Sequence, residues 1–326
     1  MRALGLALLL LALAACAPKL QPIDLLRIEP QLTAHHVIAD DGAVLPLRVW
    51  MPEGEPRAVI LALHGFNDYS KAFEDPAAQW VKAGIATFAY DQRGFGAAPY
   101  RGRWAGGDRL ARDAGVAARL LRARYPETPL FLLGESMGGA IALQLATGDA
   151  PPAVNGLILA APAVRGRASL GPLASSTLWF FGHTLPWYKL TGEGLNIRPS
   201  DNLEALRELF EDPMVIKATR IDAIYGLVDL MDAAAAAAPK LTLPTLVLYG
   251  ANEEVVSVEA ARAFVESLPR PPAPIRVAVY AEGYHLLFRD REAETVTEDV
   301  AAWIQAPGEP LPSGADGSGL AAFAPR

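Results

Sequence analysis

A serine flanked by glycines is the residue in this chain best suited to covalent chemistry. Segment 130–142 reads LFLLGESMGGAIA, in which an apolar run with the length of a buried strand precedes G-x-S-x-G and an apolar helical pattern. A sharp strand–turn–helix junction needs small flanking residues, which Gly134 and Gly138 supply, and it exposes the serine oxygen. We therefore predict that Ser136 is a catalytic nucleophile and that the Met137 N–H, at the helix start, stabilises an oxyanion.

A histidine after the last predicted strand is the candidate base. A serine hydroxyl is a poor nucleophile until a base removes its proton, and neutral histidine suits that role near pH 7. The chain has five histidines, of which His35 and His36 fall in an N-terminal strand and His183 in a long insertion. His64 lies before the nucleophile, where we expect it to shape its own loop. His285 follows the last predicted strand, so we predict that it is the base and that a carboxylate orients its imidazole.

The length and composition indicate one globular domain. The 326 residues are 52% hydrophobic and carry a net charge of −7, with a pI near 5.3. A chain of this length can bury one large core as a single α/β domain. The acidic balance leaves no basic patch on which nucleic-acid binding could be built. After the N-terminus no apolar run reaches about 18 residues, so we expect no spanning helix in the body.

The first residues have the pattern of a secretory signal. Met1 and Arg2 precede an apolar run over 3–15 that ends in small residues directly before Cys16. This arrangement resembles the lipobox of bacterial lipoproteins, whose cysteine becomes the acylated first residue after cleavage. We expect a signal peptide over 1–15 and stable anchoring by acyl chains at Cys16. The alternative is an ordinary signal peptide with an incidental cysteine.

The residues around Cys16 also predict a location and a linker. Ala17 follows the cysteine, where lipoproteins retained at the inner membrane usually carry Asp, so we expect the bacterial cell envelope and the outer membrane, facing the periplasm. Cys16 is the only cysteine, so no intramolecular disulfide can form even in an oxidising compartment. Residues 16–33 are expected to form a lipid-anchored tether.

Strands and helices then alternate as a parallel sheet requires, within residues 34–162 and 239–305. Continuous apolar runs predict buried strands, and apolar residues at helical spacing predict helices. Strands are predicted at 34–39, 44–51, 58–63, 85–90, 130–133, 156–161, 245–250 and 276–280. Helices are predicted at 71–83, 108–125, 258–268 and 289–304. The tail over 306–326 is rich in Gly, Pro and Ala, and we expect it to be disordered.

Residues 163–238 interrupt this alternation with a helical segment. An insertion of this length between two sheet strands is typical of a cap over an active site, although a helical layer with its own small core is an alternative. Helices are predicted at 202–210 and 213–225, and no strand is predicted. Its apolar aromatic clusters favour an acyl-chain substrate. The residues expected to line the substrate pocket are Trp179, Phe180, Trp187 and Tyr188.

Two charged residues next to a predicted strand are candidates for structural roles. Asp91 and Arg93 directly follow the strand at 85–90. Either side chain could take part in catalysis. We interpret them instead as a buried pair that braces loops near Ser136.

These motifs together resemble the monoacylglycerol lipase/lysophospholipase-like (serine aminopeptidase S33-like) group of α/β-hydrolases. The resemblance covers residues 35–304, including the cap. The residues that carry it are His64-Gly65, GESMGG at 134–139, Gly250 with Val255-Val256, and Tyr284-His285. It implies the α/β-hydrolase fold, with a mostly parallel central sheet, helices on both faces and a helical cap insertion. It also implies a nucleophile, an acid and a histidine in that order along the chain.

The same resemblance implies roles for two further positions. The acid of this group is normally Asp in the pattern Gly-x-x-Asp-x-Val-Val, and here Glu253 occupies that place. Glu254 is the neighbouring alternative, and Asp229 and Asp232 are more distant ones. The loop after His64 supplies the second oxyanion donor in this fold, and we assign it to the Phe66 N–H.

The resemblance implies hydrolysis of carboxylic esters, commonly monoacylglycerols or lysophospholipids, through a Ser136–Glu253–His285 triad and an acyl-enzyme. The expected partners are a lipid or small ester substrate and, through the anchor, a membrane. No nucleic acid, metal or cofactor is expected. The alternatives are an esterase for short-chain or aryl esters, a peptidase, and a scaffold lipoprotein without catalytic activity.

Overall fold

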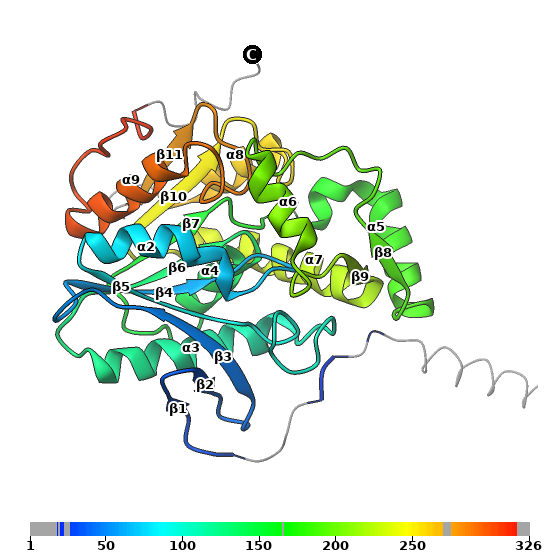
Figure 1. The fold of residues 1–326 in the computed structure, drawn as a ribbon. Coiled ribbons are helices and arrows are strands. Elements are labelled where there is room, and N and C mark those ends of the chain that lie inside the picture. The colour runs from blue at the N-terminus through cyan, green and yellow to red at the C-terminus, as the bar shows by residue number, and fades with distance from the viewer. Residues whose placement is uncertain (1–17, 19, 23–26, 165, 270–274, 318–326) are drawn as a thin grey trace, which may run out of the picture.

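A sheet of nine strands forms the centre of the molecule (Figure 1). The computed structural model describes residues 18, 20–22, 27–164, 166–269 and 275–317, so the predicted signal peptide and Cys16 lie outside the described residues. The strands of this sheet are β1 (Gln31–Leu32), β2 (His36–Ile38), β3 (Val44–Trp50), β4 (Ala58–Leu63), β5 (Ile85–Tyr90), β6 (Leu130–Glu135), β7 (Gly156–Ala160), β10 (Thr245–Gly250) and β11 (Ile275–Tyr280). Their order is β1-β2-β3-β5-β4-β6-β7-β10-β11.

The sheet is antiparallel at one side and parallel over the rest. β1, β2, β3 and β5 pair antiparallel in that order, and the strands predicted at 34–39 and 44–51 are found as the hairpin of β2 and β3. From β5 to β11 all neighbouring strands are parallel. Parallel strands end at the same edge, so the loops that follow β4, β6, β10 and β11 lie along one edge of the sheet.

Helices cover both faces of the sheet, which is why its central strands are apolar on both sides. One face is covered by η1 (Ser70–Phe73), α2 (Glu74–Lys82) and α9 (Ala293–Gln305). The other face is covered by α3 (Gly107–Arg124), α4 (Met137–Ala146) and α8 (Val258–Ser267). The predicted helix at 71–83 is therefore divided into η1 and α2, and the last helix starts at Ala293 instead of residue 289.

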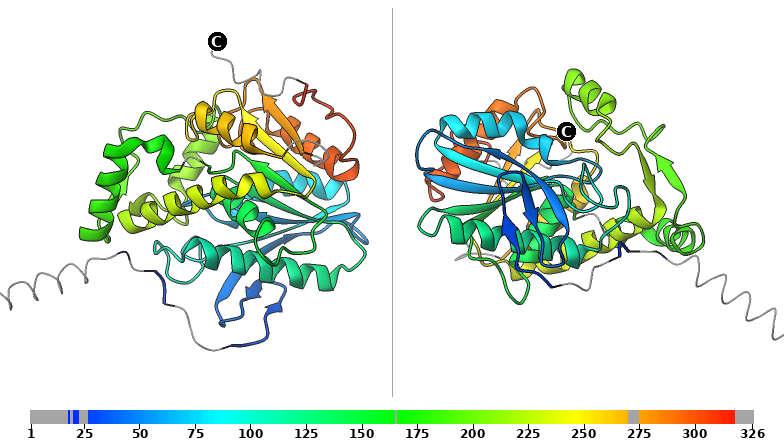
Figure 2. Two further views of the ribbon diagram at one scale, coloured as in Figure 1. Left: turned by 180° about the vertical axis from the view of Figure 1, so that it is seen from behind. Right: turned by 60° about the horizontal axis from the view of Figure 1, so that its bottom comes forward.

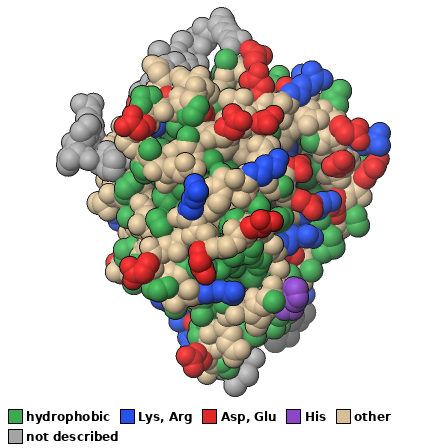
Figure 3. Space-filling view, turned by 60° about the vertical axis from the view of Figure 1, so that its left-hand side comes forward, with side chains coloured by type: hydrophobic (Ala, Val, Ile, Leu, Met, Phe, Trp, Pro, Cys, Tyr) green, Lys and Arg blue, Asp and Glu red, His purple; other side chains and the backbone are tan. Residues whose placement is uncertain are grey.

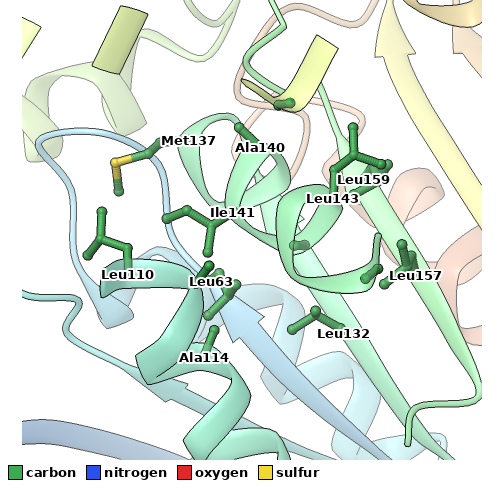
Figure 4. Packing of buried hydrophobic residues seen from close by; sticks show 14 of the residues in the cluster. Leu63, Leu110, Ala114, Leu132, Met137, Ala140, Ile141, Leu143, Leu157 and Leu159 are labelled. Atoms are coloured by element: carbon green, nitrogen blue, oxygen red, sulfur yellow. The ribbon is translucent and has the colours of Figure 1, made fainter. Parts of the chain in front are cut away.

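Helix α4 lies in the middle of the larger core (Figure 4). Its Ile141 and Leu143 are fully buried, and so is Met137 at its start. Figure 4 shows Met137 and Ile141 on the side of α4 toward Leu110 of α3 and Leu63 of β4, and Leu143 on the side near Leu159 of β7. This packing holds the N-terminus of α4 at the sheet edge, where Ser136 precedes it.

The segment between β7 and β10 forms the predicted cap at one side of the sheet (Figures 1 and 2). Its elements are α5 (Arg167–Thr184), β8 (Lys189–Thr191), α6 (Leu203–Glu211), β9 (Ala218–Arg220), α7 (Ile221–Ala237) and η2 (Ala238–Lys240). The helix predicted at 202–210 is confirmed by α6. The helix predicted at 213–225 is wrong, because β9 pairs with β8 and α7 starts only at Ile221. The Lys217 ammonium donates hydrogen bonds to three backbone carbonyls and so stabilises the intervening turn.

Charged side chains occur both on the surface and in the interior of the protein. On the face shown in Figure 3 acidic and basic side chains are interspersed. Arg93, in contrast, lies in a buried cluster of charges. Arg93 donates to Asp113 at 2.5 Å and to Asp41 at 2.6 Å. Asp91 instead accepts hydrogen bonds from the N–H and hydroxyl of Ser70. The prediction that Asp91 and Arg93 form a pair is therefore wrong. Both are buried, but partners distant in sequence satisfy each of them.

Residues 306–317 are not the disordered tail that composition predicts. Leu311 is buried, and the Ala315 carbonyl accepts a hydrogen bond from the Val279 N–H of β11 at 3.0 Å. Ser313 binds the buried Asp299 of α9 through its N–H at 3.0 Å. The tail covers the outer edge of β11, whose backbone groups supply partners that composition cannot reveal.

The predicted tether at 16–33 touches the body before the first strand. The Gln21 N–H donates to the Trp104 carbonyl, and the Ile28 N–H donates to the Asp40 carbonyl, both at 3.0 Å. The described part of this segment is therefore attached to the body and is not a simple free linker.

Candidate active site

Ser136 stands between the end of β6 and the start of α4 with a strained backbone. Its φ of 51° and ψ of −113° are unusual for a residue with a side chain. A Cβ atom at Gly134 would lie 2.3 Å from the Gly138 oxygen, and one at Gly138 would lie 2.0 Å from the Leu63 oxygen. Only glycine fits either position, so the two glycines of the motif make the sharp turn possible.

Neighbouring strands hold this turn in place. The Ser136 N–H donates to the Ala160 carbonyl of β7 at 2.9 Å. The Ser136 carbonyl accepts hydrogen bonds from Ala163 at 2.9 Å and from Ala140 at 3.2 Å. These bonds stabilise a conformation that would otherwise cost about 1–3 kcal/mol.

The loop after β4 passes directly beside the serine. A Cβ atom at Gly65 would lie 3.5 Å from the Ser136 Cβ. The adjoining Phe66 peptide therefore lies at the elbow, the sharp turn between β6 and α4 that carries Ser136. Met137 is the first residue of α4, so its N–H has no intrahelical acceptor. Within the described part of the chain, neither the Phe66 nor the Met137 N–H donates to another backbone carbonyl. Both donors are thus available to a developing oxyanion near Ser136.

His64 shapes this loop, as its position in the sequence indicates. The side chain is fully buried, and its Nε2 accepts the Gln92 N–H at 3.0 Å. Its Nδ1 therefore carries the hydrogen and donates to the Gly65 carbonyl at 2.8 Å. Burial lowers the pKa of His64, so the ring stays neutral. Its function is to hold Gly65 in place beside Ser136.

Glu253 and His285 meet at the same sheet edge from the loops after β10 and β11. The His285 Nδ1 lies 2.8 Å from Glu253 Oε2, and both side chains are buried. The other carboxylate oxygen of Glu253 accepts the Val255 and Val256 N–H groups at 2.7 and 3.0 Å. Burial disfavours the imidazolium, but the charge and hydrogen bond of Glu253 outweigh it and raise the pKa of His285. Glu253 thus orients the ring and leaves Nε2 for other chemistry.

The other acids considered from the sequence lie elsewhere. Glu254 is exposed and accepts the Arg198 N–H of the cap at 2.7 Å. Asp229 and Asp232 both pair with Arg167 at 2.5 Å within the cap. Among the described residues no group of three or more His, Cys, Asp or Glu side chains is placed to hold a metal ion. Of these candidate acids, Glu253 is the one that the structure joins to His285.

A charged cluster behind the elbow was not anticipated from the sequence. Glu135, directly before Ser136, is buried, and burial raises its pKa to about 7. The electrostatic influences on Glu135 include Arg289, Asp68 and His285. Arg289 donates to Asp68 at 2.6 Å and so joins the loop after His285 to the loop after Phe66. The sequence feature that could have indicated this cluster is the position of its charged residues. Glu135, Asp68 and Arg289 each lie within four residues of a predicted site residue.

The cap is fastened to the loop that carries Phe66. The Asn67 side chain donates to the Thr219 hydroxyl at 2.7 Å, and the Asn67 carbonyl accepts the Ile216 N–H at 2.9 Å. The Tyr69 hydroxyl donates to Asp212 at 2.8 Å. Movements of the cap are therefore coupled to the loop that carries Phe66.

The four aromatic residues assigned to a substrate pocket lie on α5 and the segment that follows it. Their side chains are 52–57% exposed. Trp179 stacks on His183 with ring centres 4.6 Å apart, and His183 packs edge-on against Tyr225 of α7. The described contacts do not bring Trp179, Phe180, Trp187 or Tyr188 to Ser136, and their pocket role stays a prediction.

A mostly parallel sheet, a strained serine at the end of β6 and a Glu–His pair on the last two loops define an α/β-hydrolase. The chain belongs to the serine aminopeptidase S33 family, whose family model matches residues 54–292. Monoglyceride lipase of Rattus norvegicus is 27% identical over 284 residues, which are 82% of this chain and 89% of that protein. Monoacylglycerol lipase of Mycolicibacterium smegmatis is 28% identical over 298 residues, which are 83% and 96% of the two chains.

Solved structures show the same fold. The Paleococcus ferrophilus monoacylglycerol lipase superposes with a TM-score of 0.65 at 22% identity, covering 80% of this chain and 98% of that one. A soluble variant of monoglyceride lipase from Saccharomyces cerevisiae gives a TM-score of 0.68 at 19% identity, covering 87% and 96%. The α/β-hydrolase fold expected from the sequence is thereby confirmed.

Proposed function

We propose that this protein hydrolyses carboxylic esters of lipids, of the monoacylglycerol or lysophospholipid type, with Ser136, His285 and Glu253 as its catalytic triad. The observation that carries the proposal is the buried Glu253–His285 hydrogen bond at the sheet edge where the Ser136 elbow opens. Relatives named monoglyceride or monoacylglycerol lipases, which align over most of both chains, support the choice of substrate.

In the first half of the reaction His285 Nε2 takes the proton of Ser136 Oγ while this oxygen bonds to the ester carbonyl carbon. The carbonyl electrons move onto its oxygen, which the N–H groups of Phe66 and Met137 stabilise. Each such donor is worth about 10²–10³ in rate. The tetrahedral intermediate collapses, and the alcohol leaves with the proton returned by His285.

In the second half a water molecule gives a proton to His285 and attacks the acyl-enzyme carbonyl. The same two N–H groups stabilise the second oxyanion. When it collapses, the fatty acid leaves and Ser136 recovers its proton from His285. Throughout, the Glu253 carboxylate stabilises the imidazolium that forms twice in each cycle.

A fluorophosphonate probe and a lipid panel test this function. The parent enzyme should be labelled and should release glycerol from a monoacylglycerol, whereas Ser136→Ala should do neither. A chain-length series of p-nitrophenyl esters separates a lipid esterase from one for short or aryl esters, and aminoacyl amides test for a peptidase. A folded parent enzyme that resists the probe would refute the triad.

We also propose that Cys16 carries the acyl chains that anchor the enzyme in the bacterial envelope, at the periplasmic face of the outer membrane. The support is the sequence pattern before Cys16 and the Ala17 that follows it. No helix in the described ranges is long and apolar enough to cross a membrane. Cys16→Ser should move the protein from the membrane fraction to the soluble fraction. Unchanged partition would contradict the anchor.

A further inference from the structure

Gln21 is bound into the body of the protein although it lies close to the proposed lipid anchor. The side chain is 5% exposed, its Nε2 donates to the Arg103 carbonyl at 2.6 Å, and its N–H donates to the Trp104 carbonyl at 3.0 Å. A Cβ atom at Gly94 would lie 2.8 Å from Gln21 Nε2, so the loop leaves just enough room for this amide. The backbone N–H and the side-chain Nε2 are thus both bonded to the loop at 103–104, whereas the buried Oε1 has no hydrogen-bond partner among the described residues. These two bonds make Gln21 an attachment point.

The attachment at Gln21 makes the tether short. Four residues lie between Cys16 and Gln21, so the two are five residue steps apart. An extended chain spans at most about 3.6 Å per residue, so the surface that holds the acyl chains lies within about 18 Å of Gln21. Without this attachment, the next ones among the described residues are at Arg27, which binds the Asp40 carboxylate, and at Ile28, whose N–H binds the Asp40 carbonyl.

The attachment point lies next to the cap. Trp104, which accepts the Gln21 N–H, packs so closely on α7 that a Cβ atom at Gly226 would lie 2.2 Å from its ring. The next residue back, Tyr225, packs against Gly182 and His183 of α5. In Figures 1 and 2 the blue segment that contains Gln21 lies beside this end of the cap in every view.

This part of the cap exposes a large apolar surface. Leu173 is 82% exposed, and five neighbouring aromatic side chains on α5 and the segment after it are 40–57% exposed. Phe180 and Phe181 pack edge-on with ring centres 5.3 Å apart, and clustered exposed apolar side chains are typical of surfaces that bind a membrane or another protein. The aromatic residues are Trp179, Phe180, Phe181, Trp187 and Tyr188.

We propose that Gln21 is a clamp that shortens the tether and turns this apolar face of the cap toward the lipid surface in which Cys16 is anchored. The inference rests on the proposed acylation of Cys16. We infer that this face contacts lipid and not another protein, because the short tether keeps the lipid surface within reach of α5. Esters dissolved in the lipid are thereby presented to the cap instead of to the opposite side of the molecule.

The experiment uses the full-length lipidated protein in vesicles of phosphatidylethanolamine and phosphatidylglycerol. A fluorophore sensitive to polarity is attached at Leu173→Cys, since acylation occupies the sulfur of Cys16. One variant carries about twelve Gly and Ser residues between Ala17 and Pro18, and a second is Gln21→Ala. The same insert after Gly54, in an exposed turn, is the matched control.

The probe should report an apolar surrounding in the parent and in the Gly54 control, and a polar one in both tether variants. Turnover of vesicle-borne monoacylglycerol should fall about sixfold with the insert and about fourfold in Gln21→Ala, because effective concentration falls with roughly the 3/2 power of tether length. Hydrolysis of p-nitrophenyl acetate in water should stay within about twofold of the parent, since Gln21 does not touch the triad.

Three outcomes would overturn the clamp. A probe in a polar surrounding in the parent would show that the cap faces away from the lipid. Equal behaviour of Gln21→Ala, the tether insert and the Gly54 control would show that the attachment does not set orientation, while ester hydrolysis and anchoring would stand. If the Cys16→Ser protein stays on the membrane, Cys16 is not the anchor. If its probe responds to protein concentration without vesicles, a second copy of the protein covers this face instead of lipid.

Discussion

The Nδ1 of His285 lies 2.8 Å from Glu253 Oε2, whereas the carboxylate of the next residue, Glu254, binds the Arg198 N–H of the cap. Adjacent residues on an extended loop point to different sides, so only one of the two can face the imidazole. The two N–H groups of Val255 and Val256 hold the first carboxylate in this direction. The structure therefore distinguishes an acid that orients His285 from one that fastens the cap.

The two neighbouring glutamates should differ in their effect on catalysis. Glu253→Gln removes the charge that stabilises the imidazolium, and kcat should fall by about 10³–10⁴. Glu254→Gln should change kcat by less than about tenfold, because its side chain is exposed. Steady-state kinetics on an aryl ester, with melting curves as the control for folding, make the comparison. A larger loss in Glu254→Gln would show that the acid is assigned to the wrong residue.

The pH dependence should follow His285. Its pKa is raised above the ordinary value of 6.5, and only the neutral ring accepts the Ser136 proton, so activity is lost as pH falls through this raised pKa. The acid limb of kcat/KM should therefore have a midpoint above 6.5 in the parent. The residual activity of Glu253→Gln should have its acid limb at lower pH, because the raising charge is gone. An acid limb at the same pH in both enzymes would contradict the pairing.

Glu135 should make stability fall as pH rises. Burial raises its folded-state pKa to about 7 from 4.5, so between these values the unfolded chain releases a proton that the folded protein retains. Stability should decrease across this window by up to about 3 kcal/mol. In Glu135→Gln the difference in unfolding free energy between pH 5 and pH 8, from urea titrations, should be smaller. The exposed Glu208→Gln is the control, and an unchanged difference in Glu135→Gln would refute the assignment.

The exposed aromatic residues of the cap should matter for long-chain substrates. Trp179→Gln or Phe180→Gln should raise KM for a long-chain ester by about fivefold, from the loss of about 1 kcal/mol of apolar contact. Turnover of an acetate ester should change little. Phe210→Gln on α6, where the side chain is 72% exposed, is the matched control. Equal losses on long and short esters would indicate damage to packing.

The strands that position the site were predictable because their patterns are local. The runs at 58–63, 85–90 and 245–250 coincide with β4, β5 and β10. A strand buried on both faces is apolar throughout and is bounded by turn residues, so its ends can be recognised without knowing its neighbours. The cap was predicted less well, since β8 and β9 are three residues each and exist only because they pair.

The partners of the charged residues were not predictable. Proximity in the sequence predicts that Arg93 pairs with Asp91, but Asp113 and Asp41 are its partners in space. Gln21 and Leu311 lie in segments whose composition predicts a tether and a disordered tail, yet both are buried. Composition describes what a segment can bury by itself, and it does not describe the surface that another part of the chain offers.

The sequence by itself determined the elbow around Ser136, because a strand, two obligatory glycines and a helix start are encoded in a few consecutive residues. It also placed His285 and an acid on loops after the last two strands, since chain order in a parallel sheet fixes which edge a loop occupies. Only the tertiary structure decided that Glu253 faces His285, that Arg289 joins the two loops at the site, and that Gln21 is attached beside the cap. Each of these depends on a contact between residues far apart in the chain, and the packing of the whole domain sets the geometry of that contact.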